Sequence, residues 1–139
     1  MTQAHGELKV ATRGKGFYDI TREVRKWMGA QHIQNGLLTV FIRHTSASLT
    51  IQENADPDVR RDMSEFFERL VPENTPWFRH TTEGRDDMPS HIRSALTSMS
   101  LSIPVRAGLP GLGTWQAIYV FEHRAEQQVR HVLLHLIGN

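Results

Sequence analysis

The stretch HTSASLTIQENADPD, from His44 to Asp58, decides how this chain folds, because it joins an apolar strand-like run to an apolar helix-like run. It combines an imidazole with hydroxyl, amide and carboxylate side chains. Buried polar groups need hydrogen-bond partners, so short polar side chains between two core-forming elements usually line a cavity. The stretch therefore predicts a site as well as a turning point of the fold.

The first part of this stretch alternates as a strand does, and it either continues the preceding strand or begins a new one after a bend at Thr45-Ser46. Successive side chains of a strand point to opposite faces. One face is predicted to be core and holds Thr45, Ala47, Leu49 and Ile51. The other is predicted to be polar, with the histidine at its edge, and holds His44, Ser46, Ser48, Thr50 and Gln52.

Strand and helix patterns precede the stretch. Leu8 and Val10 alternate with polar residues, which predicts a strand over 7–12. Apolar residues at helical spacing predict a helix from Asp19 to about Ala30. After a turn signal at Asn35-Gly36, a β-branched and aromatic run predicts a largely buried central strand over 37–42.

A helix follows the stretch directly. Asp56 is placed to cap it, Pro57 suits its first turn, and Pro72 ends it. Its apolar residues recur at helical spacing, and we expect Phe66 and Phe67 to lie in the core.

A polar segment over 73–88 separates this helix from the next, and a connection of that length is typical of a functional or mobile loop. The next helix opens at Asp87-Met88-Pro89 and carries residues as far as Met99. The glycine-rich GLPGLG is interpreted as a hairpin turn, since it lacks both phosphate-loop signatures. Further strands are predicted over 101–105, 114–121 and 129–137. The whole predicts one α+β domain over residues 1–139.

Composition excludes several classes of function. The 139 residues carry a net charge of only +1 and scattered basic residues, so the electrostatic footprint of a nucleic-acid-binding protein is missing. No apolar run approaches the ~20 residues of a membrane span. The chain has no cysteine, which excludes disulfides and thiolate chemistry and agrees with a reducing compartment. We therefore expect a cytoplasmic protein that binds neither nucleic acid nor membrane.

Three of the eight histidines fall where predicted elements meet: His44 at a strand boundary, His80 in the polar segment and His91 at a helix start. Three imidazoles with water form a known catalytic zinc arrangement, which Glu53, Asp56 or Asp87 could complete or orient. The alternative is that these histidines are simply hydrogen-bonded polar groups.

Two other chemistries remain open. Glu53 or Asp87 beside an imidazole could act as a general base. Ser46 or Ser48 as a nucleophile is disfavoured, because the GxSxG pattern is absent. An anion site is also predicted, because hydroxyls follow His44 and two helices begin nearby. Its candidate cations are Arg43, Arg93 and Arg124.

Three long motifs carry a family resemblance: HTSASLTIQENADPDV, HTTEGRDDMPSHIRSAL and GLGTWQAIYVFEHR, in that order along the chain. Together they resemble the YjbQ-like family of secondary thiamine-phosphate synthase enzymes. The resemblance runs from about Gly14 to the C-terminus. It implies a compact α+β fold with a β-sandwich core of mixed or antiparallel sheets, two to three helices, and assembly as a homotrimer. It also implies a weak activity that joins hydroxymethylpyrimidine diphosphate to thiazole phosphate.

The resemblance assigns site residues motif by motif. The family's three motif histidines correspond to His44, His80 and His91, which we expect to be catalytic and to hold a divalent metal, Zn or Mg. Glu53 and Asp87 are expected to be catalytic with them. The residues expected to hold a phosphorylated ligand are Ser46, Ser48, Asn54, Gln116 and Arg124. Ala117 departs from the glycine that the family often has there.

Two functions of different class follow. The first is a trimeric enzyme that acts on a phosphorylated small molecule. The second is a non-catalytic metal- or metabolite-binding protein that uses the same pocket.

Overall fold

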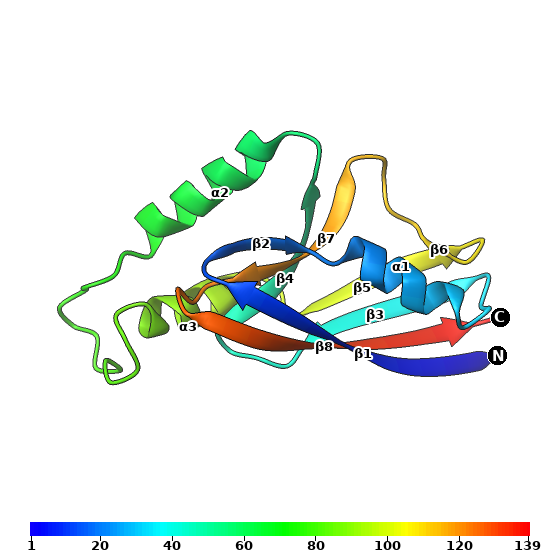
Figure 1. Cartoon of the computed structure of the whole chain (residues 1–139), viewed down its shortest axis with the longest axis horizontal. Helices are drawn as coiled ribbons and strands as arrows, with labels where there is room; N and C mark the ends of the chain where they lie inside the picture. The colour runs from blue at the N-terminus through cyan, green and yellow to red at the C-terminus, as the bar shows by residue number, and fades with distance from the viewer.

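Two antiparallel sheets build the fold, as Figure 1 shows for the computed structural model, which describes all residues 1–139. The larger sheet has the strand order β1-β8-β3-β5-β6 and the smaller one β2-β7-β4. The strands are β1 (Thr2–Arg13), β2 (Gly16–Asp19), β3 (Gly36–Ile42), β4 (Ala47–Glu53), β5 (Ser100–Arg106), β6 (Leu109–Pro110), β7 (Gln116–Glu122) and β8 (Gln127–Gly138). The helices are α1 (Thr21–Gly29), α2 (Pro57–Leu70) and α3 (Asp87–Leu96).

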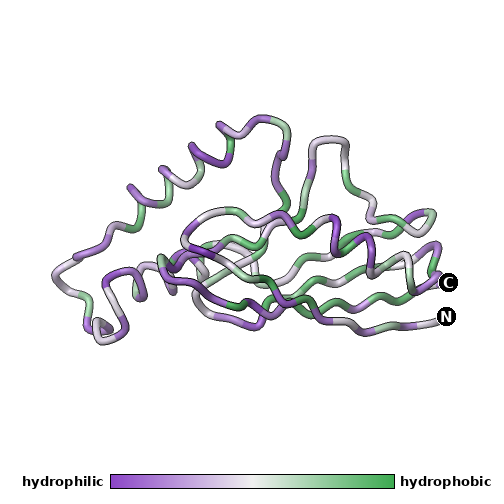
Figure 2. The backbone as a smooth tube through the Cα atoms, in the orientation of Figure 1, coloured by the Kyte–Doolittle hydropathy of each residue, from purple (hydrophilic) through white to green (hydrophobic).

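The core lies between the two sheets. Alternate apolar side chains of β3 and β8 are fully buried and contact buried residues of β4 and β7. In Figure 2 the hydrophobic stretches follow these strands, whereas the segment between α2 and α3 is largely hydrophilic. The predicted α+β fold with a β-sandwich core is therefore confirmed, and every strand pair in it is antiparallel.

The bend at Thr45-Ser46 separates two strands that belong to different sheets. β3 ends at Ile42 in the larger sheet and β4 begins at Ala47 in the smaller one. Of the two alternatives for this stretch, a new strand that begins after the bend is therefore the correct one. The stretch therefore crosses from one layer of the sandwich to the other, and His44 lies at the crossing.

Several predicted boundaries need correction. β1 is longer than expected because it pairs along its whole length with β8, from Thr2 opposite Gly138 to Arg13 opposite Gln127. β2 was not predicted, since four residues carry too little alternation. α3 ends before Met99, because Thr97 is extended and the backbone carbonyl of Met99 accepts a hydrogen bond from the Ile42 N–H.

The prediction that Phe66 and Phe67 of α2 lie in the core is wrong. None of its residues is buried, and the Phe66 side chain is 58% exposed. Phe67 is half-buried against Phe121, with ring centroids 5.3 Å apart. In Figure 1, α2 projects away from the sandwich at an angle, so one chain offers no surface to cover the rest of its apolar stripe.

α3 is attached to the smaller sheet by a buried hydrogen-bond network. The Ser48 hydroxyl lies 2.9 Å from Nε2 of His123 and 2.7 Å from the hydroxyl of Thr97, which follows α3. Ser48 and His123 are both buried. The predicted polar face of β4 is therefore not open to solvent at Ser48, because α3 covers it.

A buried ion pair joins the two sheets at the same end. Arg130 of β8 binds both carboxylate oxygens of Glu122, the last residue of β7, with Nε 2.7 Å from Oε1. The Thr12 hydroxyl of β1 donates to Oε1 at 2.6 Å. Arg130 also donates to the Ser46 hydroxyl at 2.9 Å. These contacts fix the end of the sandwich that carries α3.

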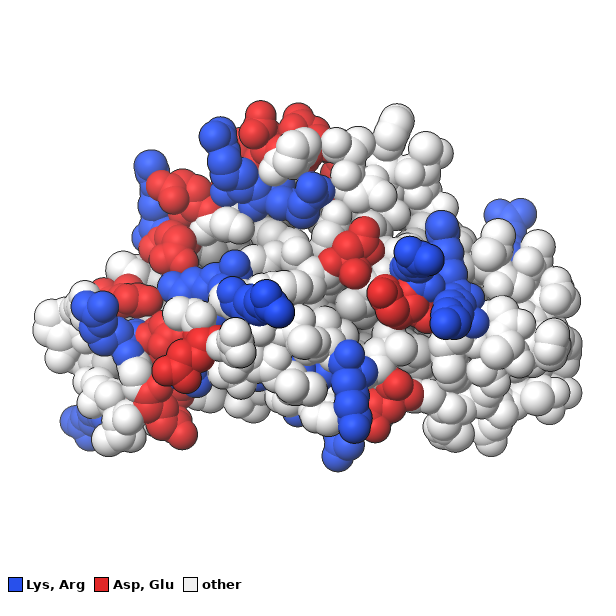
Figure 3. Space-filling model, viewed as in Figure 1, with Lys and Arg blue, Asp and Glu red and all other residues white.

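None of the three helices combines the length and hydropathy needed to cross a bilayer. On the face shown in Figure 3, acidic and basic side chains alternate over α2 and the neighbouring segment. Over α2 and this segment the face therefore carries no patch of a single sign.

Protonation of His123 is expected to limit stability in acid. Burial, followed by the charges of Arg93 and Arg130, lowers the pKa of His123 to about 3. Between that value and the ordinary pKa of about 6.5, the unfolded chain binds the extra proton and the folded chain does not. This contribution to the free energy of unfolding is complete above about pH 6.5 and is lost as the pH falls. Urea unfolding at about pH 7 and pH 5 should show that His123→Gln loses about 2 kcal/mol less than the wild type over this interval.

The exposed His5 provides the control, and His5→Gln should keep the wild-type dependence on pH. Equal loss of stability in His123→Gln and the wild type would show that His123 does not cause the acid sensitivity.

Candidate functional site

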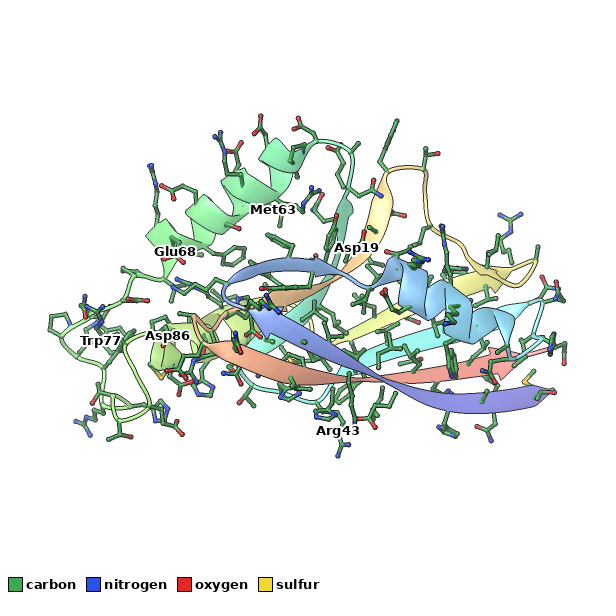
Figure 4. All side chains as sticks on the ribbon, in the orientation of Figure 1. Asp19, Arg43, Met63, Glu68, Trp77 and Asp86 are labelled. Carbon is green, nitrogen blue, oxygen red and sulfur yellow. The ribbon has the colours of Figure 1, made fainter.

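The carboxylate of Asp87 is the centre of a polar cluster at the N-terminus of α3. Its Oδ2 lies 2.6 Å from Nε2 of His80 and 3.1 Å from Nε2 of His91. His91 is one helical turn after Asp87, so the two side chains share a face of α3, while His80 comes from the preceding segment. Asp87 is buried, whereas the two imidazoles reach the surface. Figure 4 labels the neighbouring Asp86 at this end of the molecule, with Trp77 at its outer edge.

Arg124, just beyond β7, holds the other side of the cluster. Its Nη1 lies 2.6 Å from Oδ1 of Asp87, and its Nε lies 3.1 Å from Oδ2 of Asp86. Its Nη2 donates to the backbone carbonyl of Glu83 at 2.9 Å. The Ala125 N–H also donates to Asp86, at 2.7 Å. One guanidinium thus fastens the polar segment to the end of the smaller sheet.

The charges of the cluster follow from these contacts. Burial raises the pKa of Asp87, but the His80 hydrogen bond and the charges of Arg124 and His91 outweigh it, so the pKa lies below its ordinary value. The same hydrogen bond, with support from Glu83, raises the pKa of His80. Asp87 is therefore a carboxylate at neutral pH, and its Oδ2 can serve two positive or metal-bound partners.

Two imidazole nitrogens and one carboxylate oxygen form a donor set suited to a divalent transition metal. The ligand atoms of His80, Asp87 and His91 all lie within 4.8 Å of one another. An ion would take the Oδ2 of Asp87 that now receives both imidazoles. Arg124 would meanwhile keep Oδ1 in place, as outer partners of metal ligands commonly do.

His44 does not belong to this donor set. Its Nε2 accepts a hydrogen bond from the backbone N–H of His131 at 2.8 Å. Burial, then the charges of Arg130 and His131, lowers the pKa of His44, so the ring is neutral and carries its one proton on Nδ1. Neither nitrogen then offers a lone pair to a metal. The geometry thus brings together two of the three predicted histidines, and Asp87 takes the third position.

His44 instead lines an open pocket beside the cluster. The pocket has a volume of about 370 Å³, and its lining residues are His44, Thr45, His91, Ser94, Ala95 and Met99. Because His91 belongs both to the pocket and to the cluster, the two features form one continuous site.

Three predicted site residues lie at the opposite end of the smaller sheet. Glu53 pairs with Gln116, and Asn54 follows, whereas Ala47 pairs with Glu122 at the cluster end. Six residues of extended strand separate these ends by about 20 Å. Within one chain, Glu53, Asn54 and Gln116 therefore do not join His44 or the cluster, because β4 carries them away from it, and their functional roles stay predictions.

Three further residues that were predicted to hold a ligand already have hydrogen-bond partners within the chain. The Ser46 hydroxyl is bound by Arg130, and the Ser48 hydroxyl is buried in the network with His123. Arg124 is committed to Asp86, Asp87 and Glu83, so it positions the cluster and is not free to hold phosphate. Ser94 was missed, although its spacing of three residues from His91 on one helix could have revealed it.

Two packed antiparallel sheets with a histidine–carboxylate cluster at one end define a small α+β protein with a polar surface site. Comparison with known proteins gives the family. The family model described as "UPF0047 protein YjbQ-like" matches residues 6–139, and the chain belongs to this family.

Relatives and solved structures agree with that assignment. The chain is 50% identical to a UPF0047 protein of Synechocystis over 94% of this chain and 89% of that protein. It is 44% identical to the UPF0047 protein YjbQ of Salmonella typhimurium over 94% and 95% of the two chains. A conserved hypothetical protein of Thermus thermophilus has a similar crystal structure, with a TM-score of 0.85, 34% identity, and coverage of 95% and 99%.

Removal of the Arg124 guanidinium should loosen the cluster. Arg124→Gln leaves the carboxylates of the buried Asp87 and the half-buried Asp86 without their arginine partner, which should lower the free energy of unfolding by about 2 kcal/mol. It should also speed hydrogen–deuterium exchange over residues 80–86. Arg85→Gln, which removes an exposed arginine of the same segment, is the matched control and should change neither measurement. If both variants behave alike, Arg124 does not fasten this segment.

Proposed function

We propose that this chain binds a divalent transition metal, zinc first, through His80, Asp87 and His91, and acts in the cytoplasm on a phosphorylated small molecule. The observation that carries the proposal is the convergence of three donor atoms from a helix and the preceding segment within 4.8 Å. Imidazole donors suit zinc, whereas magnesium prefers oxygen ligands and retained water. Zinc is therefore favoured over magnesium.

The reaction proposed is thiamine-phosphate synthesis, which the motifs of the family imply. In it, the methylene–oxygen bond of hydroxymethylpyrimidine diphosphate breaks, pyrophosphate leaves with the electron pair, and the thiazole nitrogen forms the new carbon–nitrogen bond. A bound metal supplies positive charge to the departing diphosphate. No strong base is needed for this step, which agrees with a cluster whose only buried carboxylate is already bound by Arg124.

The residues of the chain have separate tasks in this proposal. His80 and His91 bind the metal through their imidazoles, and Asp87 completes the donor set with its Oδ2. Arg124 keeps the Asp87 carboxylate oriented through Oδ1. The Nδ1–H of His44 is available to donate to a phosphate or another acceptor in the pocket. These tasks together describe binding and orientation of an anionic substrate.

A second candidate function, a non-catalytic metal- or metabolite-binding protein, is favoured by one observation. The His80 and His91 side chains are 42% and 32% exposed, so the cluster alone does not exclude water from a reactive cation. Such exposure suits storage or sensing of a ligand.

Assembly as a homotrimer also belongs to the proposal, and surface aromatic and aliphatic side chains support it. Phe66, Leu70 and Trp77 are exposed on α2 and the segment after it. The outer face of β8, with His131, Leu133 and His135, is a second surface on which subunits could meet. Contact between copies would cover the apolar stripe of α2 and shield the cluster.

Metal analysis tests the donor set. Protein prepared without a histidine tag, treated with a chelator and titrated with zinc should bind about one ion per chain. His80→Gln, Asp87→Asn and His91→Gln should abolish stoichiometric binding, because each removes one ligand. His44→Gln is the matched control and should retain the ion, since His44 binds the His131 backbone instead. Equal loss in His44→Gln, or no binding by the wild type, would contradict the assignment.

Rescue of a thiamine auxotroph tests the reaction. Wild-type protein is expected to restore growth, and His91→Ala is expected to fail when it is expressed and folded to the same extent. Equal growth with the two proteins would remove His91 from the chemistry. No growth with either would favour the non-catalytic function.

A further inference from the structure

One residue that lines the pocket beside the cluster has a buried hydroxyl that no group of the chain satisfies. Ser94 is 4% exposed, its Oγ is buried, and it has no hydrogen-bond partner. Ser94 nevertheless lines the pocket. An unpaired buried polar atom is unfavourable for the folded chain, so its presence at the wall of a pocket points to a partner that arrives from outside.

A second polar group of the pocket is oriented by the backbone. Because the His131 N–H occupies Nε2 of His44, the proton of this neutral ring is on Nδ1. His44 is therefore a fixed hydrogen-bond donor, and Nδ1 has no acceptor among the side chains and backbone of the protein. His44 reaches the pocket from the crossing between the sheets, whereas Ser94 reaches it from α3.

The remaining walls favour a flat, largely apolar body. Met99 contributes a polarisable thioether, Ala95 a methyl group, and His44 and His91 two imidazole rings. Thioethers and aromatic faces both pack well against a planar ring. A volume of about 370 Å³ lies within the range of small-molecule sites and is sufficient for a single substituted ring.

We propose that this pocket recognises the body of the ligand: a planar ring with hydrogen-bond acceptors, contacted by Ser94 and His44, whose anionic group lies at the His80–Asp87–His91 cluster. The inference rests on the proposed function, because the cluster supplies the site for the anion. Ser94 and His44 are then specificity-determining residues, and neither is a ligand of the metal. The cluster holds the anionic group, which many phosphorylated molecules share. The pocket distinguishes among these molecules by their rings.

Calorimetry with three probes on the zinc-loaded protein separates the two parts of the site. Inorganic phosphate reports the cluster alone, benzyl phosphate adds a ring, and pyridin-4-ylmethyl phosphate adds a ring acceptor. The wild type should bind benzyl phosphate about 10-fold more tightly than inorganic phosphate, because the ring is buried. The pyridine nitrogen should add about 5-fold more, as one hydrogen bond typically does.

Two variants assign these gains to the pocket. Ser94→Ala should remove the advantage of the pyridine nitrogen and keep that of the ring. Ala95→Trp places a bulky side chain at an exposed position of the pocket wall and should remove both gains. Both variants should bind zinc and inorganic phosphate as the wild type does.

Thermal stability gives an independent reading of Ser94. Since its hydroxyl has no partner to lose, Ser94→Ala should leave the melting temperature unchanged or raise it. Ser90, buried on the same helix, donates its hydroxyl to the Asp87 carbonyl, so Ser90→Ala should lower the melting temperature. A decrease in Ser94→Ala equal to that in Ser90→Ala would mean that Ser94 is structural.

The outcomes distinguish this inference from the proposed function. Zinc and phosphate binding without any preference for the ring probes would overturn the pocket inference alone. Absence of zinc from the wild type would overturn the proposed metal centre. In that case benzyl alcohol and pyridin-4-ylmethanol would be titrated into the metal-free wild type and both variants. The preference of the wild type for the pyridine, and its loss in the variants, would then decide the pocket inference.

Discussion

The buried ion pair between Glu122 and Arg130 is the contact on which the functional end of the molecule depends. It joins the smaller sheet to the larger one, and the Thr12 hydroxyl completes it from β1. Removal of one partner of such a pair is severe, because the other charge remains in the core. The second oxygen of Glu122 also accepts the backbone N–H groups of His123 and Arg124. The same carboxylate therefore fixes both the sandwich and the turn that carries Arg124.

A series of hydrogen bonds connects that turn to the surface of the molecule. Arg124 orients Asp87 and Asp86, and Asp87 receives His80 and His91. The hydrogen bond from Thr97, which follows α3, to the buried Ser48 holds α3 against β4. Asp87 is buried, whereas His80 and His91, which it receives, reach the surface. A rigid inner layer with exposed imidazoles at its end is a suitable arrangement for binding, since preorganised donors lose little freedom when a ligand arrives. The arrangement also explains why a polar segment without regular structure can still present defined side chains.

Local patterns predicted most of the fold, and long-range contacts account for most of the errors. Alternation in β3, β7 and β8 and the helical spacing of α1 and α3 are properties of neighbouring residues, so they can be read from the sequence. His80, Asp87 and His91 could be selected as reactive types near a helix start. The backbone partner of His44 is a residue of β8, however, and no spacing reveals it. Glu53 lies away from the cluster because the strand between it and His44 is extended, so residues near in sequence are far apart in space. Phe66 is exposed because helical amphipathicity does not say whether a covering surface exists within the same chain.

The pairing of the first strand with the last has a consequence for biosynthesis. Residues at the two ends of the chain, such as Thr2 and Gly138, face each other across a ladder that also places β8 between β1 and β3. During translation the position between β1 and β3 in the larger sheet is therefore filled only after the other strands and helices of the fold have been synthesised. Contacts of such high contact order require a large loop-closure entropy before they become favourable, which makes folding slow. Until β8 arrives, the nascent chain holds two open strand edges, a state in which chaperone binding or aggregation competes with completion of the sandwich.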